Sequence, residues 1–275
     1  MINYPEWYKL APVKFNIIKY TYRRETMFIK AKHSVREGKT TRMIRIHNVQ
    51  HLDLWLKSMQ VFKHLREYNL YYSLAKYEDG IPYGSLDLGN RDFGNWVEEN
   101  HKQIVSYDFL LDIDCGNHKE MPFAYISAKK LKNFFDKNDV PYHLRFSGMG
   151  FHFIIPFKCF IDYNLSFNPD ENRNIYEFFM DIAMKLHNRF SEMIDLRIYD
   201  SRRVAKIPYS LALFDNDNYV CYPFKNNEDF EIFKLEYMQP IHFLNKVDNE
   251  PEYMFNEKGN VNKLLKDLRI KTGVD

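Results

Sequence analysis

The segment Phe109–Gly116, FLLDIDCG, constrains the fold more than any other part of the chain. An apolar run of this length, bounded by Gly116 and Asn117, predicts a strand near the centre of a sheet. Because strand side chains alternate between faces, Asp112 and Asp114 share one face, and Leu111 and Ile113 can enter a core on the other. Two carboxylates at this spacing repel each other unless a cation lies between them. Taken alone, the pair fits either a solvated strand end or a site for a hard divalent ion such as Mg²⁺ or Mn²⁺.

The elements around this strand predict an α/β (α+β) fold in a single domain over residues 1–275, since no clear linker interrupts the chain. The order β-α-β-β-α-β across 105–224 matches a split βαβ core in a mixed sheet, with helices on the sheet faces. Ser127 is the expected cap of the first core helix, with Leu131, Phe134 and Phe135 facing inward. The expected segments are strands in 13–29, 70–78, 142–157 and 202–224, helices in 49–68, 127–140, 173–194 and 261–270, and a surface connection over 79–103.

Composition indicates a packed protein, because 45% of the residues are hydrophobic and 17% are aromatic. The net charge of +2 does not by itself indicate nucleic-acid binding. The stretch Arg23–Arg45 is locally basic, with eight Lys or Arg against two Glu. It fits either a solvated face or a surface that follows a phosphate backbone.

The three cysteines lie far apart and form no CxxC pair, so no structural zinc is expected in this chain. Sparse cysteines in odd number are typical of a reducing compartment. No apolar run has the length of a membrane span, and the first residues lack the layout of a signal peptide. The expectation is therefore a soluble, intracellular (cytoplasmic) protein.

Two further stretches carry residues suited to phosphate chemistry. In SGMGFH, residues 147–152, the glycines allow close backbone approach to phosphate oxygens, and Ser147 and His152 supply side-chain donors. A tight hairpin with a core histidine explains the same letters. In DLRIYDSRRVAKIPYSL, residues 195–211, Asp195 can join the other carboxylates, while Arg203 and Lys206 bring positive charge towards an anionic substrate. A charged helix end followed by a basic strand is the simpler alternative.

Together these residues resemble the archaeo-eukaryotic primase superfamily, and most closely its small catalytic subunit. FLLDID resembles the DhD strand of that family, RFSGMGFH its SGxGhH motif, and Asp195 with Lys206 and IPYSL its third motif. RRETMFI (23–29) and YYSLAKYE (71–78) are similar to two N-terminal strands of the family. The resemblance covers residues 20–224, which leaves 225–275 as a C-terminal extension.

The resemblance implies a primase catalytic fold and a template-directed nucleotidyltransferase that makes short primers on single-stranded DNA from nucleoside triphosphates. Asp112, Asp114 and Asp195 would hold two Mg²⁺ or Mn²⁺ ions. The nucleotide-binding residues would be Arg24, Ser147, His152, Arg203 and Lys206. It also implies either a large-subunit partner with an iron–sulfur cluster or a chain that works alone, in an archaeal, viral or plasmid-encoded setting.

The chain departs from the family pattern in three places. Cys115 is the one cysteine between the first two motifs, with His118 as a nearby candidate soft ligand, so the zinc knuckle of many small subunits is absent. Ala212 stands where a histidine often follows the PxSL motif. The run Asp195–Tyr199 also resembles the primase-polymerase branch. Three alternatives therefore remain: a polymerase that mainly extends or fills gaps, a catalytically silent nucleic-acid-binding subunit, and a metal-dependent nuclease.

Overall fold

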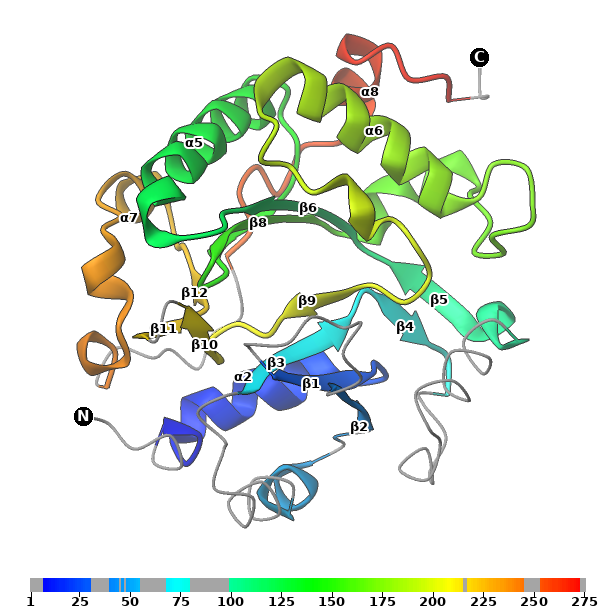
Figure 1. Cartoon of the computed structure of the whole chain (residues 1–275). Coiled ribbons are helices and arrows are strands. Elements are labelled where there is room, and N and C mark those ends of the chain that lie inside the picture. Colours follow the sequence, from blue (N-terminus) through cyan, green and yellow to red (C-terminus); the bar gives the residue numbers. More distant parts are fainter. Residues whose placement is uncertain are drawn as a thin grey trace.

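The computed structural model describes most of the chain and places its elements around two four-stranded sheets (Figure 1). The described residues are 7–30, 40–44, 46, 48–54, 68–79, 99–214, 217–244 and 253–272. Among them, no helix is both long and apolar enough to cross a membrane.

The first sheet contains the DID strand and has the order β12 (Tyr222–Pro223), β7 (His143–Phe146), β8 (Gly150–Ile155) and β6 (Phe109–Asp114). Strand β8 is antiparallel to both β6 and β7, so β6 and β7 run parallel with β8 between them. Helix α5 (Met121–Lys137) connects β6 to β7, which is the predicted split βαβ arrangement. The predicted α/β class is confirmed. The predicted mixed sheet differs in detail, because every ladder between described strands is antiparallel.

The second sheet has the order β2 (Thr40–Ile44), β1 (Thr26–Lys30), β3 (Tyr68–Ser73) and β9 (Val204–Lys206). Figure 1 shows α5 and α6 (Ile175–Phe190) over the first sheet and α2 (Ala11–Thr21) beside the second. Strand β9, the last of the predicted β-α-β-β-α-β order, pairs with β3 rather than with β6. The chain after α6 therefore leaves the first sheet and enters the second.

The prediction of strand structure from residue 13 is wrong, because this segment first forms helix α2 and turns into a strand only at Thr26. The buried side chains Val13, Asn16 and Ile17 follow helical spacing, and a proline at the first turn suits a helix start. The apolar and aromatic composition of this segment favoured a strand, whereas the spacing of its buried positions is that of a helix.

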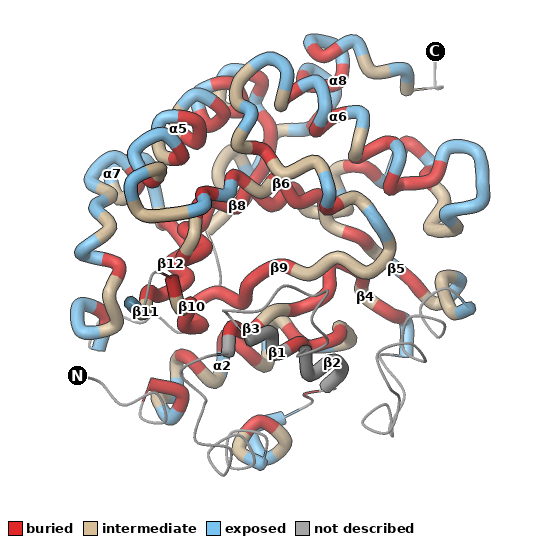
Figure 2. Tube along the Cα trace, in the orientation of Figure 1, coloured by how far each residue is buried: buried red, intermediate tan, exposed pale blue. Residues whose placement is uncertain are grey.

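Helix α5 confirms the predicted core positions and corrects the predicted start. Leu131, Phe134 and Phe135 are buried, as expected. Figure 2 shows buried and exposed stretches alternating along α5. The helix begins at Met121, six residues earlier than predicted, with a proline in its first turn. Ser127 is therefore not the cap. Its hydroxyl lies inside the helix packing and accepts a hydrogen bond from the Ser191 hydroxyl at 2.8 Å.

The remaining predictions have mixed outcomes. The strand over 70–78 appears as β3 and β4 (Ala75–Tyr77), and the C-terminal helix as α8 (Asn262–Asp267). Residues 49–54 are helical, and 55–67 of the predicted helix lie outside the described residues. So do 80–98 of the predicted surface connection, and 31–39 and 45 of the basic stretch. The predicted hairpin over 202–224 is formed by β10 (Leu211–Phe214) and β11 (Asp217–Val220), although its turn residues 215–216 are not described.

The other elements complete the chain order. They are η4 (His101–Gln103), β5 (Ile104–Tyr107), η5 (His118–Glu120), η6 (Phe157–Tyr163), η7 (Leu196–Ile198), β10 (Leu211–Phe214), β11 (Asp217–Val220), α7 (Asn227–Glu231), η8 (Leu235–Met238) and η9 (Pro240–His242).

Candidate functional site

A row of polar side chains crosses the first sheet on the face turned away from its helices. Asp112 pairs with His152 across β6 and β8, and His152 pairs with Arg145 across β8 and β7. Directly paired residues of neighbouring strands point to the same face. Leu111 and Ile113 are fully buried and alternate with the acidic positions, as predicted. The His152 Nε2 atom lies 3.4 Å from Asp112 Oδ1, so the row begins with a carboxylate beside an imidazole.

Asp195 is held beside these carboxylates by the backbone. Its N–H donates to the Asp112 carbonyl at 2.9 Å, and the Asp114 N–H donates to the Met193 carbonyl at 3.1 Å. An isolated antiparallel bridge joins Ile113 to Ile194. Residues 193–195 thus lie along the free edge of β6, where a split βαβ fold would have its next strand. The structure therefore brings together the three aspartates that the sequence singled out.

The three carboxylates differ in their electrostatic environment. Burial raises the pKa of Asp112 well above its ordinary value of 3.8, and the charges of Asp114 and Asp195 raise it further against the opposing charge of Lys206. Burial likewise raises the pKa of Asp114, with Lys206 acting in the opposite direction. Burial would raise the pKa of Asp195 too, but hydrogen bonds and charge from Arg197 outweigh it and lower that pKa.

The turn between β7 and β8 comes close to the second sheet. The Ser147 N–H donates to the Gly150 carbonyl at 2.9 Å and closes the turn. Gly148 has φ +94°, and a Cβ there would lie 2.2 Å from the Ala212 Cβ and 3.6 Å from the Lys206 Nζ. The glycine therefore suits both the backbone conformation and the contact with Ala212. As a result, the turn predicted to approach phosphates lies directly beside the Lys206 ammonium.

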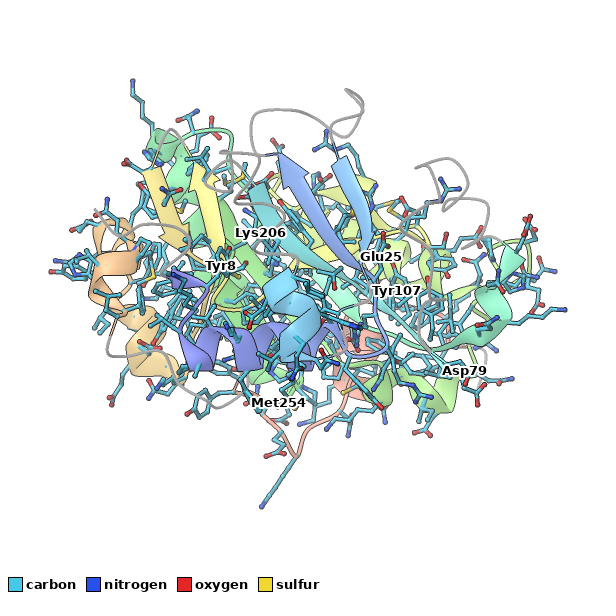
Figure 3. All side chains as sticks on the ribbon, turned by 90° about the horizontal axis from the view of Figure 1, so that it is seen from below. Tyr8, Glu25, Asp79, Tyr107, Lys206 and Met254 are labelled. Carbon is cyan, nitrogen blue, oxygen red and sulfur yellow. The ribbon has the colours of Figure 1, made fainter. Side chains whose placement is uncertain are left out.

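Lys206, which is labelled in Figure 3, is a buried cation on β9. Its residue is 3% exposed, and its Nζ has no hydrogen-bond partner among the described residues. The Nζ lies 5.8 Å from the centre of the Tyr71 ring, the cross-strand neighbour of Lys206. Burying an ammonium without hydrogen bonds is unfavourable, so this position favours an anionic ligand that would complete its contacts.

His152 is neutral at pH 7. Burial, with the positive charges of Arg145 and Lys206, lowers the pKa of the His152 imidazole well below its ordinary value of 6.5. A neutral imidazole has one N–H donor and one acceptor nitrogen. The Nδ1 atom has no hydrogen-bond partner among the described residues, so one ring nitrogen is free to contact a ligand.

The other predicted nucleotide-binding residues are placed unequally. The Ser147 side chain is buried at the turn, where its Oγ accepts a 3.4 Å hydrogen bond from the Met149 N–H. Arg203 pairs with Asp200 at 3.0 Å, and its charge opposes the rise in the pKa of Asp112. Both residues belong to the segments that form the polar cluster, which consists of Asp112, Asp114, His152, Asp195 and Lys206.

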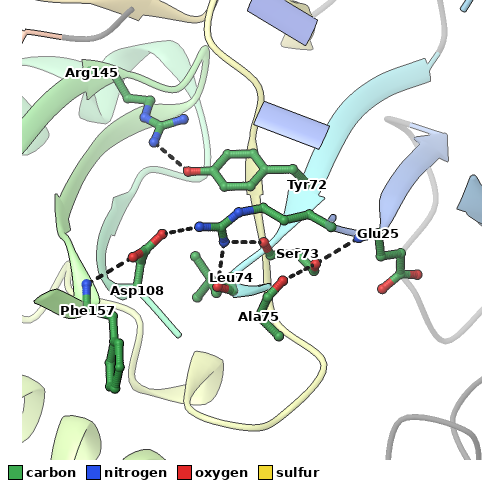
Figure 4. A network of polar contacts seen from close by, with 9 residues as sticks. Glu25, Tyr72, Ser73, Leu74, Ala75, Asp108, Arg145 and Phe157 are labelled. Atoms are coloured by element: carbon green, nitrogen blue, oxygen red, sulfur yellow. Dashed lines mark hydrogen bonds and ion pairs between the residues drawn. The ribbon is translucent and has the colours of Figure 1, made fainter. Parts of the chain in front are cut away.

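Arg24 is committed to contacts within the protein, and its partners Ser73, Leu74 and Asp108 are labelled in Figure 4. Its guanidinium donates to the carbonyls of Ser73 and Leu74, at 2.9 and 2.6 Å, and to Asp108 Oδ2 at 2.7 Å. These bonds join the second sheet to the start of β6. A role for Arg24 in nucleotide binding therefore stays a prediction.

Two residues were missed by the sequence analysis. Arg145 is fully buried and donates to the Lys206 carbonyl at 2.5 Å and to the Tyr72 hydroxyl at 2.8 Å. The register of the SGMGFH hairpin would have found it, because Arg145 and His152 flank the turn as a cross-strand pair. Arg197, the ion-pair partner of Asp195, carries no pattern signal beyond lying two residues away.

The donor chemistry of the cluster fits a hard divalent cation, since Asp112, Asp114 and Asp195 offer only carboxylate oxygens. Burial, and then repulsion by Asp114 and Asp195, raise the pKa of Asp112, and a cation would relieve the repulsion. Within the described part of the chain, no group of three His, Cys, Asp or Glu side chains is arranged to hold a metal ion as it stands. Both oxygens of Asp195 accept hydrogen bonds from Arg197 instead.

Comparisons with known proteins add little to this geometry. No family model and no curated protein sequence matches the chain. Among solved structures, the polymerase domain from Mycobacterium tuberculosis Ligase D in complex with DNA aligns over 97% of this chain and 88% of its own, with a TM-score of 0.42 and 12% identity. A likeness at this level carries no argument about fold or activity.

Proposed function

We propose that this chain is a template-directed nucleotidyltransferase of the primase or primase-polymerase type. It would join nucleoside triphosphates into short primers on single-stranded DNA. The proposal rests on the residues of the cluster and on the order of motifs in the sequence.

One juxtaposition carries the proposal: two carboxylates lie within electrostatic reach of a buried ammonium, and a third carboxylate lies beside them. Asp112, Asp114 and Asp195 form the anionic side, and Lys206 lowers the pKa of the first two from the cationic side. A polyanion with bound cations, such as a nucleoside triphosphate, complements both sides at once. A nuclease would explain the carboxylates but not the buried ammonium without hydrogen bonds. A catalytically silent subunit would explain neither the carboxylates nor the ammonium.

Each side of the cluster has a distinct role in the proposed reaction. The three aspartates would hold two Mg²⁺ or Mn²⁺ ions, which would supply charge stabilisation for phosphoryl transfer when bound. Lys206 would bind non-bridging oxygens of the triphosphate, with the neutral His152 imidazole and the Ser147 hydroxyl as further donors. The 3′-hydroxyl of the growing strand would lose its proton to water, and its oxygen would bond to the α-phosphorus as the bond to the bridging oxygen breaks. Pyrophosphate then leaves, and no protein group is covalently modified.

The template and partner remain part of the proposal. The basic stretch Arg23–Arg45 supports contact with a phosphate backbone. Ala212 packs against the Gly148 turn, so the position where the family often has a histidine is filled by a side chain small enough for that contact. Initiation would require either a large-subunit partner or this chain alone, and synthesis on unprimed template distinguishes the two.

The decisive experiment measures synthesis on single-stranded DNA with labelled nucleoside triphosphates and Mg²⁺ or Mn²⁺, with and without an annealed primer. Wild type is compared with the double variant Asp112→Asn/Asp114→Asn and with Asp162→Asn/Asp170→Asn, which removes two exposed carboxylates elsewhere.

Short products on unprimed template that disappear only in the first variant would support a self-sufficient primase. Extension of an annealed primer alone would support the primase-polymerase alternative. Degradation of labelled DNA in the absence of nucleotides would identify a nuclease. If wild type neither incorporates nucleotides nor degrades DNA, the silent-subunit alternative would be supported.

A further inference from the structure

The Asp195 carboxylate is occupied by a neighbouring side chain that is itself almost wholly in solvent. Arg197 donates from Nε to Asp195 Oδ1 at 2.9 Å and from Nη2 to Oδ2 at 3.1 Å, and its backbone N–H donates to Oδ1 at 2.9 Å. The Arg197 side chain is 86% exposed, whereas that of Asp195 is 17% exposed. A surface cation thus covers the oxygens of a largely buried carboxylate.

The backbone and the side chain of Asp195 are positioned for different partners. The backbone holds Asp195 against Asp112 through a 2.9 Å hydrogen bond. Even so, no three acidic, His or Cys side chains of the described residues are arranged around a common ion position. Both oxygens of the Asp195 carboxylate are engaged by Arg197, although the backbone of Asp195 lies beside that of Asp112.

We propose that Arg197 is an exchangeable counter-ion that competes with a divalent cation for Asp195. This inference rests on the proposed function, since it concerns the same ion site. Arg197 is the exposed partner of this pair, so water can solvate its guanidinium once it is released, and salt screens its attraction to Asp195. A divalent ion that gains Asp195 as a third carboxylate can therefore displace the Arg197 guanidinium, which moves into solvent while its backbone stays in η7.

The competition has a specific consequence for ion affinity. With Arg197 bound, the ion must break two charge-assisted hydrogen bonds before it acquires its third ligand, so resting affinity is lower than the three carboxylates alone would give. Removing the Arg197 side chain should therefore tighten ion binding. A guanidinium that merely stabilised the local fold would produce no such gain.

Direct Mn²⁺ binding tests this inference without reference to catalysis. Free Mn²⁺ is followed by electron paramagnetic resonance during titration of wild type, Arg197→Gln and Arg197→Lys. We expect about a three- to tenfold lower Kd for Arg197→Gln, because the ion no longer has to break two partly screened hydrogen bonds between Arg197 and Asp195. Arg197→Lys keeps the charge but cannot form both side-chain hydrogen bonds to the carboxylate, so its Kd should lie between those of wild type and Arg197→Gln.

Two controls separate this effect from general charge. Lys185→Gln removes one positive charge from the exposed side of α6 and should leave the Kd unchanged. In an Asp195→Asn background, Arg197→Gln should no longer tighten binding, because the contested carboxylate is gone. A gain that persists in that background would overturn the inference.

The inference and the proposed function fail in different ways. Unchanged or weaker Mn²⁺ binding in Arg197→Gln, with weakened binding in Asp112→Asn, would overturn the counter-ion role and leave the ion site intact. If Asp112→Asn and Asp114→Asn bind Mn²⁺ as tightly as wild type, the ion site of the proposed function itself fails. Thermal melting checks that each variant is folded.

Discussion

At the scale of single residues, two buried lysines differ in whether the fold itself supplies a partner for the ammonium. Lys132 and Lys206 are both almost completely buried. The Lys132 Nζ forms an ion pair with Asp136 at 2.7 Å within α5. The Lys206 Nζ has no hydrogen-bond partner among the described residues. Lys132 therefore has its partner within the fold, whereas Lys206 is suited to bind an anion.

Replacing Lys206 by Met should weaken nucleoside triphosphate binding by about tenfold or more, the usual effect of losing a hydrogen bond to a charged group. The matched control is Lys132→Met, which also removes a buried ammonium but on the helix side of the first sheet. It should lower stability and leave nucleotide affinity unchanged. Anisotropy of a fluorescent nucleotide measures both. Equal affinity losses in the two variants would contradict a direct role for Lys206.

Asp112 should reduce the stability of the protein when no divalent ion is present. Its pKa is raised in the folded state, so between the ordinary value of 3.8 and the raised pKa the folded protein holds more protons than the unfolded chain. Stability therefore falls as pH rises through this window, by about 1.4 kcal/mol for each pH unit that separates the folded and unfolded pKa values.

Asp112→Asn should accordingly raise the melting temperature at pH 7 in the presence of a chelator, and the difference should vanish below pH 3.8, where both states are protonated. Adding Mg²⁺ should stabilise wild type more than the variant. Calorimetry at several pH values measures the effect. A variant less stable than wild type at pH 7 would contradict the electrostatic account.

At the scale of elements, the site depends on how closely β8 approaches β6. A Cβ at Gly150 would lie 1.9 Å from the Ile113 carbonyl oxygen, whereas one at Gly116 would meet nothing closer than 3.4 Å. The absence of a side chain at Gly150 therefore sets the separation of the two strands. It also sets the register that pairs Asp112 with His152.

Gly150→Ala should destabilise the protein by about 2 kcal/mol or more, because a backbone atom must move to accommodate the methyl group. Gly116→Ala is the matched control, since its neighbour is the end of a Glu120 side chain, and should cost much less. Urea unfolding of both variants provides the comparison. Similar midpoints would show that the strands separate more easily than the packing implies.

At the scale of the whole molecule, the Arg24–Asp108 ion pair connects the two sheets. The Arg24 guanidinium binds carbonyls at the end of β3, and Asp108 at the start of β6 accepts from both Arg24 and the Phe157 N–H (Figure 4). The Arg24 and Asp108 side chains are 13% and 15% exposed. Partly buried, multiply bonded pairs of this kind stabilise more than surface pairs do.

A double-mutant cycle with Arg24→Met and Asp108→Asn should give a coupling energy of about 1–3 kcal/mol in chemical unfolding. Nucleotide affinity measured on the same variants decides the role of Arg24. We expect both substitutions to change it equally little. A loss confined to Arg24→Met would restore Arg24 as a triphosphate ligand.

Sequence reasoning found what depends on local pattern and missed what depends on contacts between distant segments. The alternation around Asp112 and Asp114 predicted their shared face, and the motif order selected Asp195 and Lys206. The sequence did not indicate that the segment after α6 crosses to the second sheet, because β9 is only three residues long and its partner β3 is remote. The bonds of Arg24 and Arg145 depend on how the two sheets dock, which no periodicity encodes.

The crossing between the sheets also limits how the chain can change length over evolutionary time. Asp195 is fixed to the first sheet and Lys206 to the second, and residues 196–205 span the distance between them. An inserted or deleted residue there would alter the separation between the carboxylates and the ammonium. Related sequences should therefore vary freely in length over 80–98 while keeping the interval 195–206 constant.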